Sequence, residues 1–212
     1  YIHNWYGLTE STSPCIVTPL GLESPADPES GALSIGLPVP NSDVKMCDVE
    51  TGAVLPHYQV GEIVAKGPMV VPGYWNKPEE TANAIKDGWL HTGDVGKMDE
   101  KGWIYIIDRK KDLINASGYK IWPRDVEDVL YEHEAVAEAC VIGVPDSYRG
   151  ETVKAFVTVR DKYKGKISGE DIKSFCKGKM ADYKYPRIVE IVDEIPKTQT
   201  GKILRRQLKE QE

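Results

Sequence analysis

Side chains near the start of the chain are of the types that bind a nucleotide and its metal ion. The stretch Tyr6–Glu10 places an aromatic ring, a glycine, a hydroxyl and a carboxylate within five residues. A flat ring can lie against a base, and a glycine lets the backbone approach a ligand closely. A carboxylate can hold Mg²⁺, which usually takes one or two carboxylates together with phosphate oxygens. A strand that ends in a turn would use the same residues, so both interpretations stay open for this stretch.

A second stretch, Trp89–Asp94, places one carboxylate directly after a glycine. Asp94 could accept both hydroxyls of a ribose there, as an acidic residue does in dinucleotide-binding folds. An Asp that caps a turn would give the same pattern. His91 has no cysteine or second histidine nearby, so we interpret it as a packed or surface histidine.

The third stretch, Asp108–Lys120, contains six charged residues, five of them in Asp108–Asp112. It follows Trp103–Ile107, whose apolar and aromatic residues predict a buried strand. So many charges do not suit a core strand. They suit a solvated connector between two bodies, the rim of a site for a charged ligand, or a plain charged loop.

The fourth stretch, Pro196–Ile203, presents a Gly-Lys pair on a polar loop. A phosphate-binding Walker loop would need a glycine at position 196 and a serine or threonine at position 203. Pro196 and Ile203 exclude that motif. Lys202 is then either a solvated lysine or a cation that meets a charged ligand.

The composition indicates a globular chain of one or two domains. It has 212 residues, of which 41% are hydrophobic and 28% charged, and a net charge of −6, which argues against general nucleic-acid binding. From Lys162 onward there are 13 basic and 8 acidic residues, a balance of +5, against −11 for the preceding part. A basic tail on an acidic body could serve a phosphate-rich ligand, or it could be solvated surface.

The cysteines indicate a cytoplasmic location. Cys15, Cys47, Cys140 and Cys176 stand far apart with no Cys-x-x-Cys pair, which favours reduced thiols over a disulfide framework or a zinc site. No apolar run has the length of a membrane span, and no signal peptide is visible. The chain starts at Tyr1, without a methionine and inside a motif-like stretch, so we expect a fragment of a longer protein.

The elements that must position these residues form two groups. In the first half we expect a small antiparallel β unit and a short helix opened by Lys77–Thr81. In the second half we expect a compact α+β unit, because strands and helices alternate within about a hundred residues. Its predicted strands are 136–144, 153–159 and 188–192, and its predicted helices follow Pro123, the capping box Ser168–Asp171 and Leu204.

Taken together and in this order, the stretches resemble motifs of the adenylate-forming superfamily of acyl-CoA synthetases, adenylation domains and luciferases. The match runs from about Tyr6 to Arg206. The motifs are the adenine and Mg²⁺ motif at Tyr6–Glu10, the β-subdomain motif from Gly61 to Trp75, the ribose motif at His91–Asp94, the hinge motif from Asp108 to Glu127 and the catalytic-lysine loop at Pro196–Lys202.

The resemblance implies an α/β and α+β fold. Residues 1–108 would be the end of the large adenylating domain with its β-rich subdomain, and residues 109–212 a small mobile α+β domain. It also implies two reaction steps: a carboxylic acid and ATP give acyl-AMP and pyrophosphate, and coenzyme A then takes the acyl group as a thioester. ATP/AMP, Mg²⁺, CoA and a small carboxylic acid are the implied ligands, without nucleic acid or a membrane span, and a homodimer is left open.

The resemblance also implies a role for each matching residue. Lys202 would reach the α-phosphate and the carboxylate during adenylation, where a placed cation stabilises the developing charge. Lys111 would be the hinge for rotation of the small domain. The remaining roles are adenine packing and close approach for Tyr6 and Gly7, phosphate contact for Thr9, Mg²⁺ binding for Glu10, the ribose hydroxyls for Asp94 and Arg109, and the pantetheine tunnel for Gly118.

One part of the family pattern is missing from this sequence. The Ser/Thr/Gly-rich phosphate loop lies ahead of the position where this chain starts, and so does most of the acyl pocket. We therefore expect the chain to be inactive by itself. Tyr-Gly-Leu-Thr-Glu-Ser and Gly-Tyr-Trp-Asn resemble fatty-acyl-CoA ligases most. Aryl-CoA ligases, peptide-synthetase adenylation domains and a non-catalytic nucleotide-binding or partner-binding relative remain alternatives, although Lys202 and Gly118 speak against the last.

Overall fold

The computed structural model describes residues 3–212, and the chain divides into two compact units, Tyr1–Lys111 and Asp112–Glu212. The division lies three residues beyond the boundary expected after Asp108. Two contacts keep the intervening residues with the first unit. Arg109 still pairs with Asp94 in a strand ladder, and the Lys110 ammonium binds Glu62.

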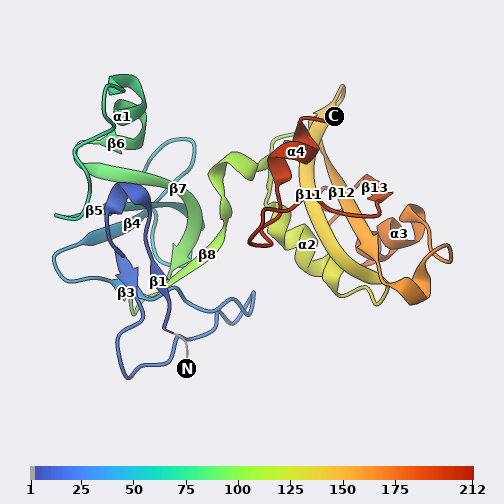
Figure 1. The fold of residues 1–212 in the computed structure, drawn as a ribbon, viewed down its shortest axis with the longest axis horizontal. Coiled ribbons are helices and arrows are strands. Elements are labelled where there is room, and N and C mark those ends of the chain that lie inside the picture. Colours follow the sequence, from blue (N-terminus) through green and yellow to red (C-terminus); the bar gives the residue numbers. More distant parts are fainter. Residues whose placement is uncertain (1–2) are drawn as a thin grey trace. The chain divides into compact units, whose positions relative to one another are not determined.

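The first unit is built on antiparallel sheets (Figure 1). The larger sheet has the order β4-β5-β7-β6, with β8 also pairing β7. Its strands are β4 (Asp43–Cys47), β5 (Gly61–Lys66), β6 (Ile85–Lys86), β7 (Trp89–Met98) and β8 (Ile104–Arg109). A three-stranded sheet contains β1 (Trp5–Tyr6), β2 (Ile16–Val17) and β3 (Leu37–Pro38), and helix α1 is Pro78–Ala84.

The core of this unit explains why β5 is apolar on both faces. Ile63 and Ala65 are fully buried in a cluster with Ile16, Met46 and Ile104. The adjacent Val64 is buried as well, so both faces of the strand are covered. Fully burying one such side chain stabilises the fold by about 1.5–3 kcal/mol. The expected β unit and the short helix α1 are both present.

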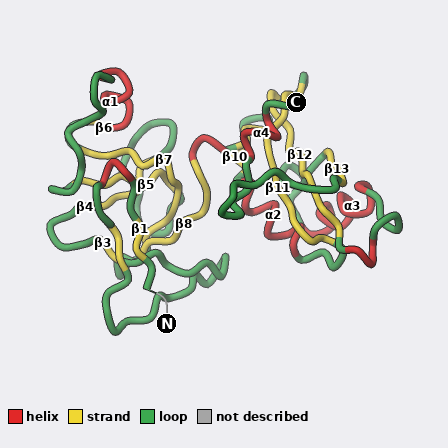
Figure 2. The backbone as a smooth tube through the Cα atoms, in the orientation of Figure 1, coloured by secondary structure: helices red, strands yellow, loops and turns green. Residues whose placement is uncertain are grey.

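The second unit is a five-stranded sheet with three helices (Figure 2). The sheet has the order β10-β9-β12-β11, and β13 pairs with β12 in parallel. Its strands are β9 (Ile114–Ala116), β10 (Tyr119–Ile121), β11 (Val136–Asp146), β12 (Gly150–Val159) and β13 (Ile188–Ile191). Its helices are α2 (Pro123–Tyr131), α3 (Gly169–Lys179) and α4 (Arg205–Lys209).

Alternation along β11 creates two separate apolar layers in this unit. Val141 faces a cluster that includes Val126 of α2 and Ile172 of α3. The next residue, Ile142, faces the other way, into a cluster with Leu208 of α4. Successive side chains of a strand point to opposite faces, so α2 and α3 cover one face of the sheet and α4 covers the other.

Local sequence signals set the helix starts in this unit. Pro123 is the first residue of α2, where the missing N–H costs nothing. The Ser168 hydroxyl accepts a hydrogen bond from the Asp171 amide, and the Asp171 carboxylate accepts one from the Ser168 amide. This confirms the predicted capping box, whose loss typically costs about 1 kcal/mol.

All four cysteines are buried free thiols. Burial is the main reason that the pKa of Cys140 rises to about 12 and that of Cys176 to about 11. Both are therefore protonated and unreactive at neutral pH. Within residues 3–212, every helix is too short or too polar to cross a bilayer.

Candidate nucleotide site

The site is built around a bulge in β7. Glu62 of β5 pairs with Val95 and Val64 pairs with His91, so a single residue, Ile63, faces the three residues Thr92-Gly93-Asp94. We call Thr92–Asp94 the β7 bulge. Gly93 has a φ of +72°, a conformation that glycine adopts without strain. Bulges redirect side chains at functional sites, and here the redirected residue is Asp94.

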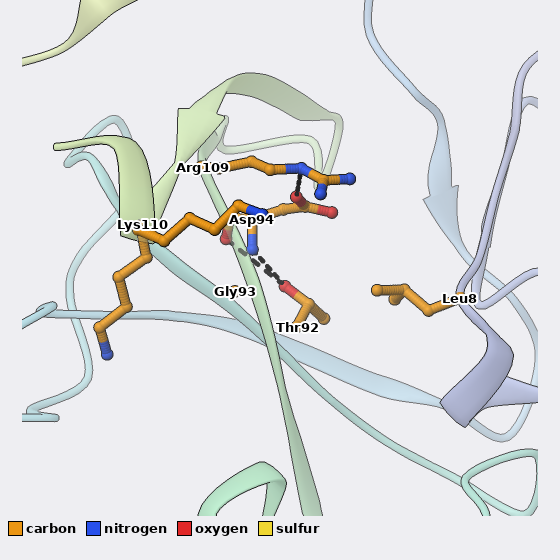
Figure 3. Close-up of a pocket in the computed structure, with 7 residues that line it drawn as sticks. Leu8, Thr92, Gly93, Asp94, Arg109 and Lys110 are labelled. Atoms are coloured by element: carbon orange, nitrogen blue, oxygen red, sulfur yellow. Dashed lines mark hydrogen bonds and ion pairs between the residues drawn. The ribbon is translucent and has the colours of Figure 1, made fainter. Parts of the chain in front are cut away.

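Asp94 is held between two other predicted site residues. Asp94 is only 8% exposed. The Tyr6 hydroxyl donates to Asp94 Oδ2 at 2.7 Å. On the other oxygen, Arg109 Nε lies 3.2 Å from Asp94 Oδ1, as Figure 3 shows for the Arg109–Asp94 pair. Burial, followed by the nearby Asp94 charge, raises the pKa of Tyr6 far above its ordinary value. Tyr6 therefore stays protonated and acts as the donor in this contact.

Two adjoining hollows meet at these residues. One has a volume of about 330 Å³ and is lined by Leu8, Thr92, Gly93, Asp94, Arg109, Lys110 and Lys111. The other has a volume of about 620 Å³, shares Leu8, Asp94 and Arg109 with the first, and is also lined by Tyr6, Gly7, Thr9 and Glu10. Seven of the nine residues predicted from sequence thus line one continuous hollow region, although Tyr6 and Asp94 are 88 positions apart.

A tight turn presents Thr9 and Glu10 to the larger hollow. Residues Thr9–Ser11 form a 3₁₀ helix, closed by a hydrogen bond of 2.9 Å from the Leu8 amide to the buried Ser11 hydroxyl. At Gly7, an added Cβ would lie 2.8 Å from the Ser13 carbonyl oxygen. The glycine is therefore required by this backbone contact, whatever ligand the site binds.

Glu10 has a partner that the sequence did not reveal. The Tyr74 hydroxyl donates to Glu10 Oε1 at 2.5 Å from a position 64 residues away. The hydrogen bond to Glu10 is the largest cause that raises the pKa of Tyr74, so the hydroxyl keeps its proton. The only signal was the motif Gly-Tyr-Trp-Asn, which resembled the family without indicating a role for its tyrosine.

This part of the site fits Mg²⁺. Among residues 3–212, no three His, Cys, Asp or Glu side chains come together as a metal cluster. Glu10 and Asp94 both line the larger hollow. Asp94 is already held by Tyr6 and Arg109, whereas Tyr74 takes only the Oε1 atom of Glu10. A single carboxylate with most other ligands from phosphate and water is a usual Mg²⁺ arrangement.

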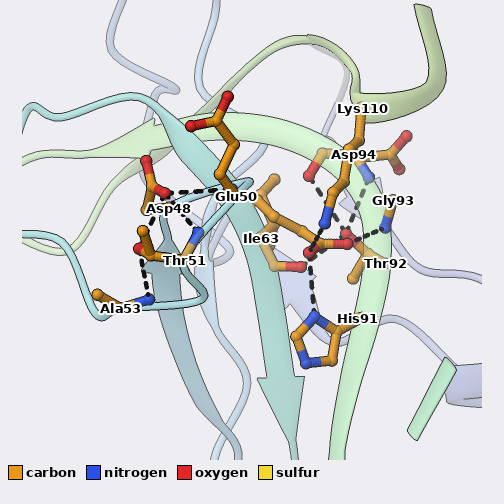
Figure 4. A network of polar contacts seen from close by, with 11 residues as sticks. Asp48, Glu50, Thr51, Ala53, Ile63, His91, Thr92, Gly93, Asp94 and Lys110 are labelled. Atoms are coloured by element: carbon orange, nitrogen blue, oxygen red, sulfur yellow. Dashed lines mark hydrogen bonds and ion pairs between the residues drawn. The ribbon is translucent and has the colours of Figure 1, made fainter. Parts of the chain in front are cut away.

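Behind the β7 bulge lies a buried acid, Glu62, whose side chain is only 5% exposed. Its carboxylate accepts from the Gly93 amide at 3.2 Å and contacts His91 Nδ1 and Lys110 Nζ, each at 3.0 Å (Figure 4). Burial by itself raises the pKa of Glu62, but the hydrogen bonds from His91 and Lys110 bring it below its ordinary value. His91 is thus a packed histidine with a defined partner.

The other two predicted residues, Gly118 and Lys202, lie in the second unit. Gly118 is in the hairpin turn between β9 and β10, where Ser117 has a φ of +54° and Gly118 a φ of +83°. Positive φ at both central residues is typical of a type I′ turn. The backbone therefore favours a glycine here, independently of any tunnel for a ligand.

Lys202 stands on a closed hairpin. The Thr198 amide donates to the Lys202 carbonyl at 2.8 Å, and the Leu204 amide donates to the Pro196 carbonyl at 2.8 Å. Gly201, at the turn, has a φ of +82°. The predicted polar loop is thus a defined structure that presents an exposed Lys202 side chain.

Comparison with known families identifies the class. The sequence model of the family described as AMP-binding enzyme matches residues 1–75. The sequence model described as AMP-binding enzyme C-terminal domain matches residues 125–202. The chain belongs to this family of AMP-binding enzymes. The resemblance drawn from the five motifs is thereby confirmed.

Three individual proteins show which members of the family this chain is similar to. A long-chain-fatty-acid–CoA ligase of Bacillus subtilis is 56% identical over 179 residues, which cover 84% of this chain and 32% of that protein. A 2-succinylbenzoate–CoA ligase of a Geobacillus strain is 38% identical, covering 99% of this chain and 41% of that protein. ATP-bound MatB from Rhodopseudomonas palustris is 32% identical with a TM-score of 0.87, over 99% of this chain and 40% of that structure. The structural match confirms the predicted fold class, and the chain spans about a third to two fifths of the length of these relatives.

Proposed function

We propose that this chain is part of an acyl-CoA synthetase that activates a carboxylic acid with ATP and transfers the acyl group to CoA. The observation that carries the proposal is the meeting of Tyr6, Glu10, Asp94 and Arg109 at one hollow. An aromatic ring, a carboxylate for Mg²⁺ and a carboxylate–guanidinium pair are the groups that an adenosine triphosphate needs. The names of the relatives agree with this reaction class.

In the adenylation step, a substrate carboxylate oxygen attacks the α-phosphorus of ATP and the bond to pyrophosphate breaks. Asp94, oriented by Tyr6 and Arg109, accepts the ribose hydroxyls. Glu10 holds Mg²⁺, which supplies positive charge to the phosphates when bound. The Lys202 ammonium approaches the α-phosphate and the carboxylate, and it stabilises the charge that develops there.

In the second step, the CoA sulfur attacks the acyl carbon and AMP leaves with the bonding electron pair. Gly118, on the β9–β10 turn, lies beside the pantetheine arm. A Cβ at this position meets no atom of the chain within 4 Å, so there is open space around the turn for another molecule. Between the two steps, the second unit rotates about Lys111.

A fatty acid is the proposed substrate. The motifs Tyr-Gly-Leu-Thr-Glu-Ser and Gly-Tyr-Trp-Asn and the name of the Bacillus relative support it. An aromatic acid is the second candidate, because a 2-succinylbenzoate–CoA ligase matches 99% of the chain.

The test is thioester formation by the full-length protein with ATP, CoA and a series of acids: acetate, octanoate, palmitate, benzoate and 2-succinylbenzoate. The proposal expects AMP and acyl-CoA in equal amounts, with the highest kcat/KM for palmitate or octanoate. A higher kcat/KM for 2-succinylbenzoate or benzoate would assign the aromatic class instead. Absence of AMP formation with every acid would overturn the proposed reaction.

A further inference from the structure

The β7 bulge lacks regular pairing with β5, although Asp94 still pairs with Arg109 of β8, so backbone amides in the bulge need other partners. The Gly93 amide donates to Glu62 Oε1 at 3.2 Å, and the Asp94 amide donates to the Thr92 hydroxyl at 3.1 Å. The same hydroxyl donates to the Ile63 carbonyl at 2.7 Å. Side chains thus replace ladder hydrogen bonds where Asp94 is redirected, and such replacement avoids the cost of unpaired buried backbone groups.

The second carboxylate oxygen of Glu62, Oε2, contacts two further residues. Oε2 lies 3.0 Å from His91 Nδ1 and 3.0 Å from Lys110 Nζ. His91 precedes the β7 bulge, and Lys110 directly follows Arg109, the partner of Asp94. One carboxylate therefore contacts the chain on both sides of the Asp94–Arg109 pair.

Burying the Glu62 carboxylate in β5 costs folding free energy unless the charge is paired. The next three residues, Ile63, Val64 and Ala65, are all buried and apolar. A charge in such a strand is tolerated only when it is paired and hydrogen-bonded, and Glu62 meets this condition through three donors. A strand that only filled the core would carry an apolar side chain here.

We propose that Glu62 is a positioning residue for the nucleotide site: its Oε1 atom fixes the β7 bulge that aims Asp94, and its Oε2 atom fixes Lys110 beside Arg109. The inference rests on the proposed function, because it assumes that Asp94 and Arg109 bind the ribose. Glu62 lines neither hollow, so it would act on the nucleotide through Asp94 and Lys110.

Two conservative variants separate position from charge. Glu62→Gln keeps an oxygen for the Gly93 amide but removes the charge that pairs with Lys110. Glu62→Asp keeps the charge but withdraws the oxygens by one methylene group. Lys110→Met removes only the ion pair, and Glu79→Gln, at an exposed position of α1, is the matched control.

Binding of AMP to the full-length protein by calorimetry is the first measurement, and amide hydrogen exchange of residues 92–95 is the second. We expect Glu62→Asp to weaken AMP binding about tenfold to a hundredfold, the usual effect of losing a supporting contact or misplacing a ligand group by about 1 Å. Exchange at Gly93 and Asp94 should accelerate in the same variant. Glu62→Gln, which keeps an oxygen for the Gly93 amide, should weaken AMP binding less than Glu62→Asp, and Glu79→Gln should bind AMP within about threefold of the wild type. Lys110→Met, which loses the Oε2 contact, should also weaken AMP binding less than Glu62→Asp and should accelerate exchange only near residue 110.

The outcomes separate this inference from the proposed function. If the wild type fails to bind AMP, the proposed function is overturned and the inference with it. If the wild type binds AMP and a folded Glu62→Asp binds it equally with unchanged exchange, only the role of Glu62 is overturned. A loss of AMP binding in Glu62→Gln with none in Glu62→Asp would also overturn it, because charge rather than oxygen position would then be decisive.

Discussion

The hydrogen bond between Tyr74 and Glu10 prepares the carboxylate that is proposed to bind Mg²⁺. The Tyr74 hydroxyl occupies Glu10 Oε1 and fixes the direction of the carboxylate. Partners of this kind orient metal ligands, and their loss typically costs about 10–100-fold in metal affinity or activity. The contact is exposed, so we expect an effect near the lower end of that range.

Tyr74→Phe should therefore raise the Mg²⁺ concentration needed for half-maximal ATP binding by about tenfold in the full-length protein. Trp75→Phe is the control, because the neighbouring Trp75 is 89% exposed. Calorimetric titration of ATP at several Mg²⁺ concentrations measures the effect without turnover. An unchanged Mg²⁺ dependence in Tyr74→Phe would mean that Glu10 is oriented in another way or is not the Mg²⁺ ligand.

Lys202 is the residue whose removal should separate the two half-reactions. Lys202→Ala should slow adenylation by about 10²–10³, the usual scale for loss of one positioned electrostatic donor. Thioester formation from supplied acyl-AMP should be largely spared, because this step does not need the lysine at the α-phosphate. Arg206→Ala, which removes an exposed cation four residues later, is the control. Equal loss of both half-reactions would contradict the assignment.

At the scale of elements, α4 is attached to the second unit by a partly buried ion pair. Arg205 Nη2 lies 2.7 Å and 2.6 Å from the two carboxylate oxygens of Glu127 in α2. Glu127 Oε1 also accepts from the Val141 amide of β11 at 2.8 Å. Arg205 directly follows the Lys202 hairpin, so the pair fixes one end of that hairpin.

Arg205→Met should destabilise the second unit, since it removes the cation that is bonded to both oxygens of Glu127. The loss should be smaller than about 3–5 kcal/mol, the typical value for a fully buried pair, because the Arg205 side chain is 25% exposed. The double variant with Glu127→Met should recover part of that loss, since the carboxylate that Arg205 neutralised is then removed as well. Arg206→Met, at a side chain that is 90% exposed, is the matched control. Urea unfolding curves of the 212-residue chain measure these changes. A single variant as stable as the control would show that the pair does not hold α4.

The elements differ in how well sequence patterns predict them. Strands β11, β12 and β13 and the helices of the second unit were predicted because their apolar residues recur with clear periods, as in β11 and α3, whereas the short strands β9 and β10 were not. Strand β7 was not predicted, because Gly93, Asp94 and Lys97 interrupt its apolar pattern. Lys97 is buried there only because Asp27 and Glu29 pair with it from about 70 residues away.

The site shows the same division between local and distant signals. The residues on short motifs, such as Tyr6 and Asp94, could be chosen by their chemistry and by resemblance. Glu62 and Tyr74 could not be assigned, because their roles depend on partners 29 to 64 positions away. Folding alone brings these partners together, and a single sequence carries no local trace of the contact.

At the scale of the whole molecule, the chain matches only about a third to two fifths of its relatives' length. The resemblance implies that the family's phosphate loop and most of its acyl pocket lie outside the part of the relatives that this chain matches. We therefore expect no acid-dependent exchange of pyrophosphate into ATP by the chain alone, and clear exchange by the full-length protein. Measurable exchange by the 212-residue chain would contradict this prediction.

The boundary between the units is where we expect the pivot of the two-step reaction. Lys111 is the last residue of the first unit, and Asp112 begins the second. Lys110 is held to the first unit by Glu62, whereas the Lys111 side chain is exposed. A hinge needs only a few backbone dihedrals that change while both bodies stay rigid. Lys111 has this setting.

Lys111→Pro should trap one orientation of the second unit, because proline fixes φ at about −65° and also restricts the residue before it. If the trapped orientation is the adenylating one, acyl-AMP should still form in the full-length protein while thioester formation collapses. Lys111→Ala is the control, since it removes the same side chain but leaves the backbone free. Single-turnover assays of each half-reaction, with unfolding curves to verify the fold, measure the outcome. A folded Lys111→Pro enzyme with wild-type rates in both half-reactions would show that the rotation pivots elsewhere.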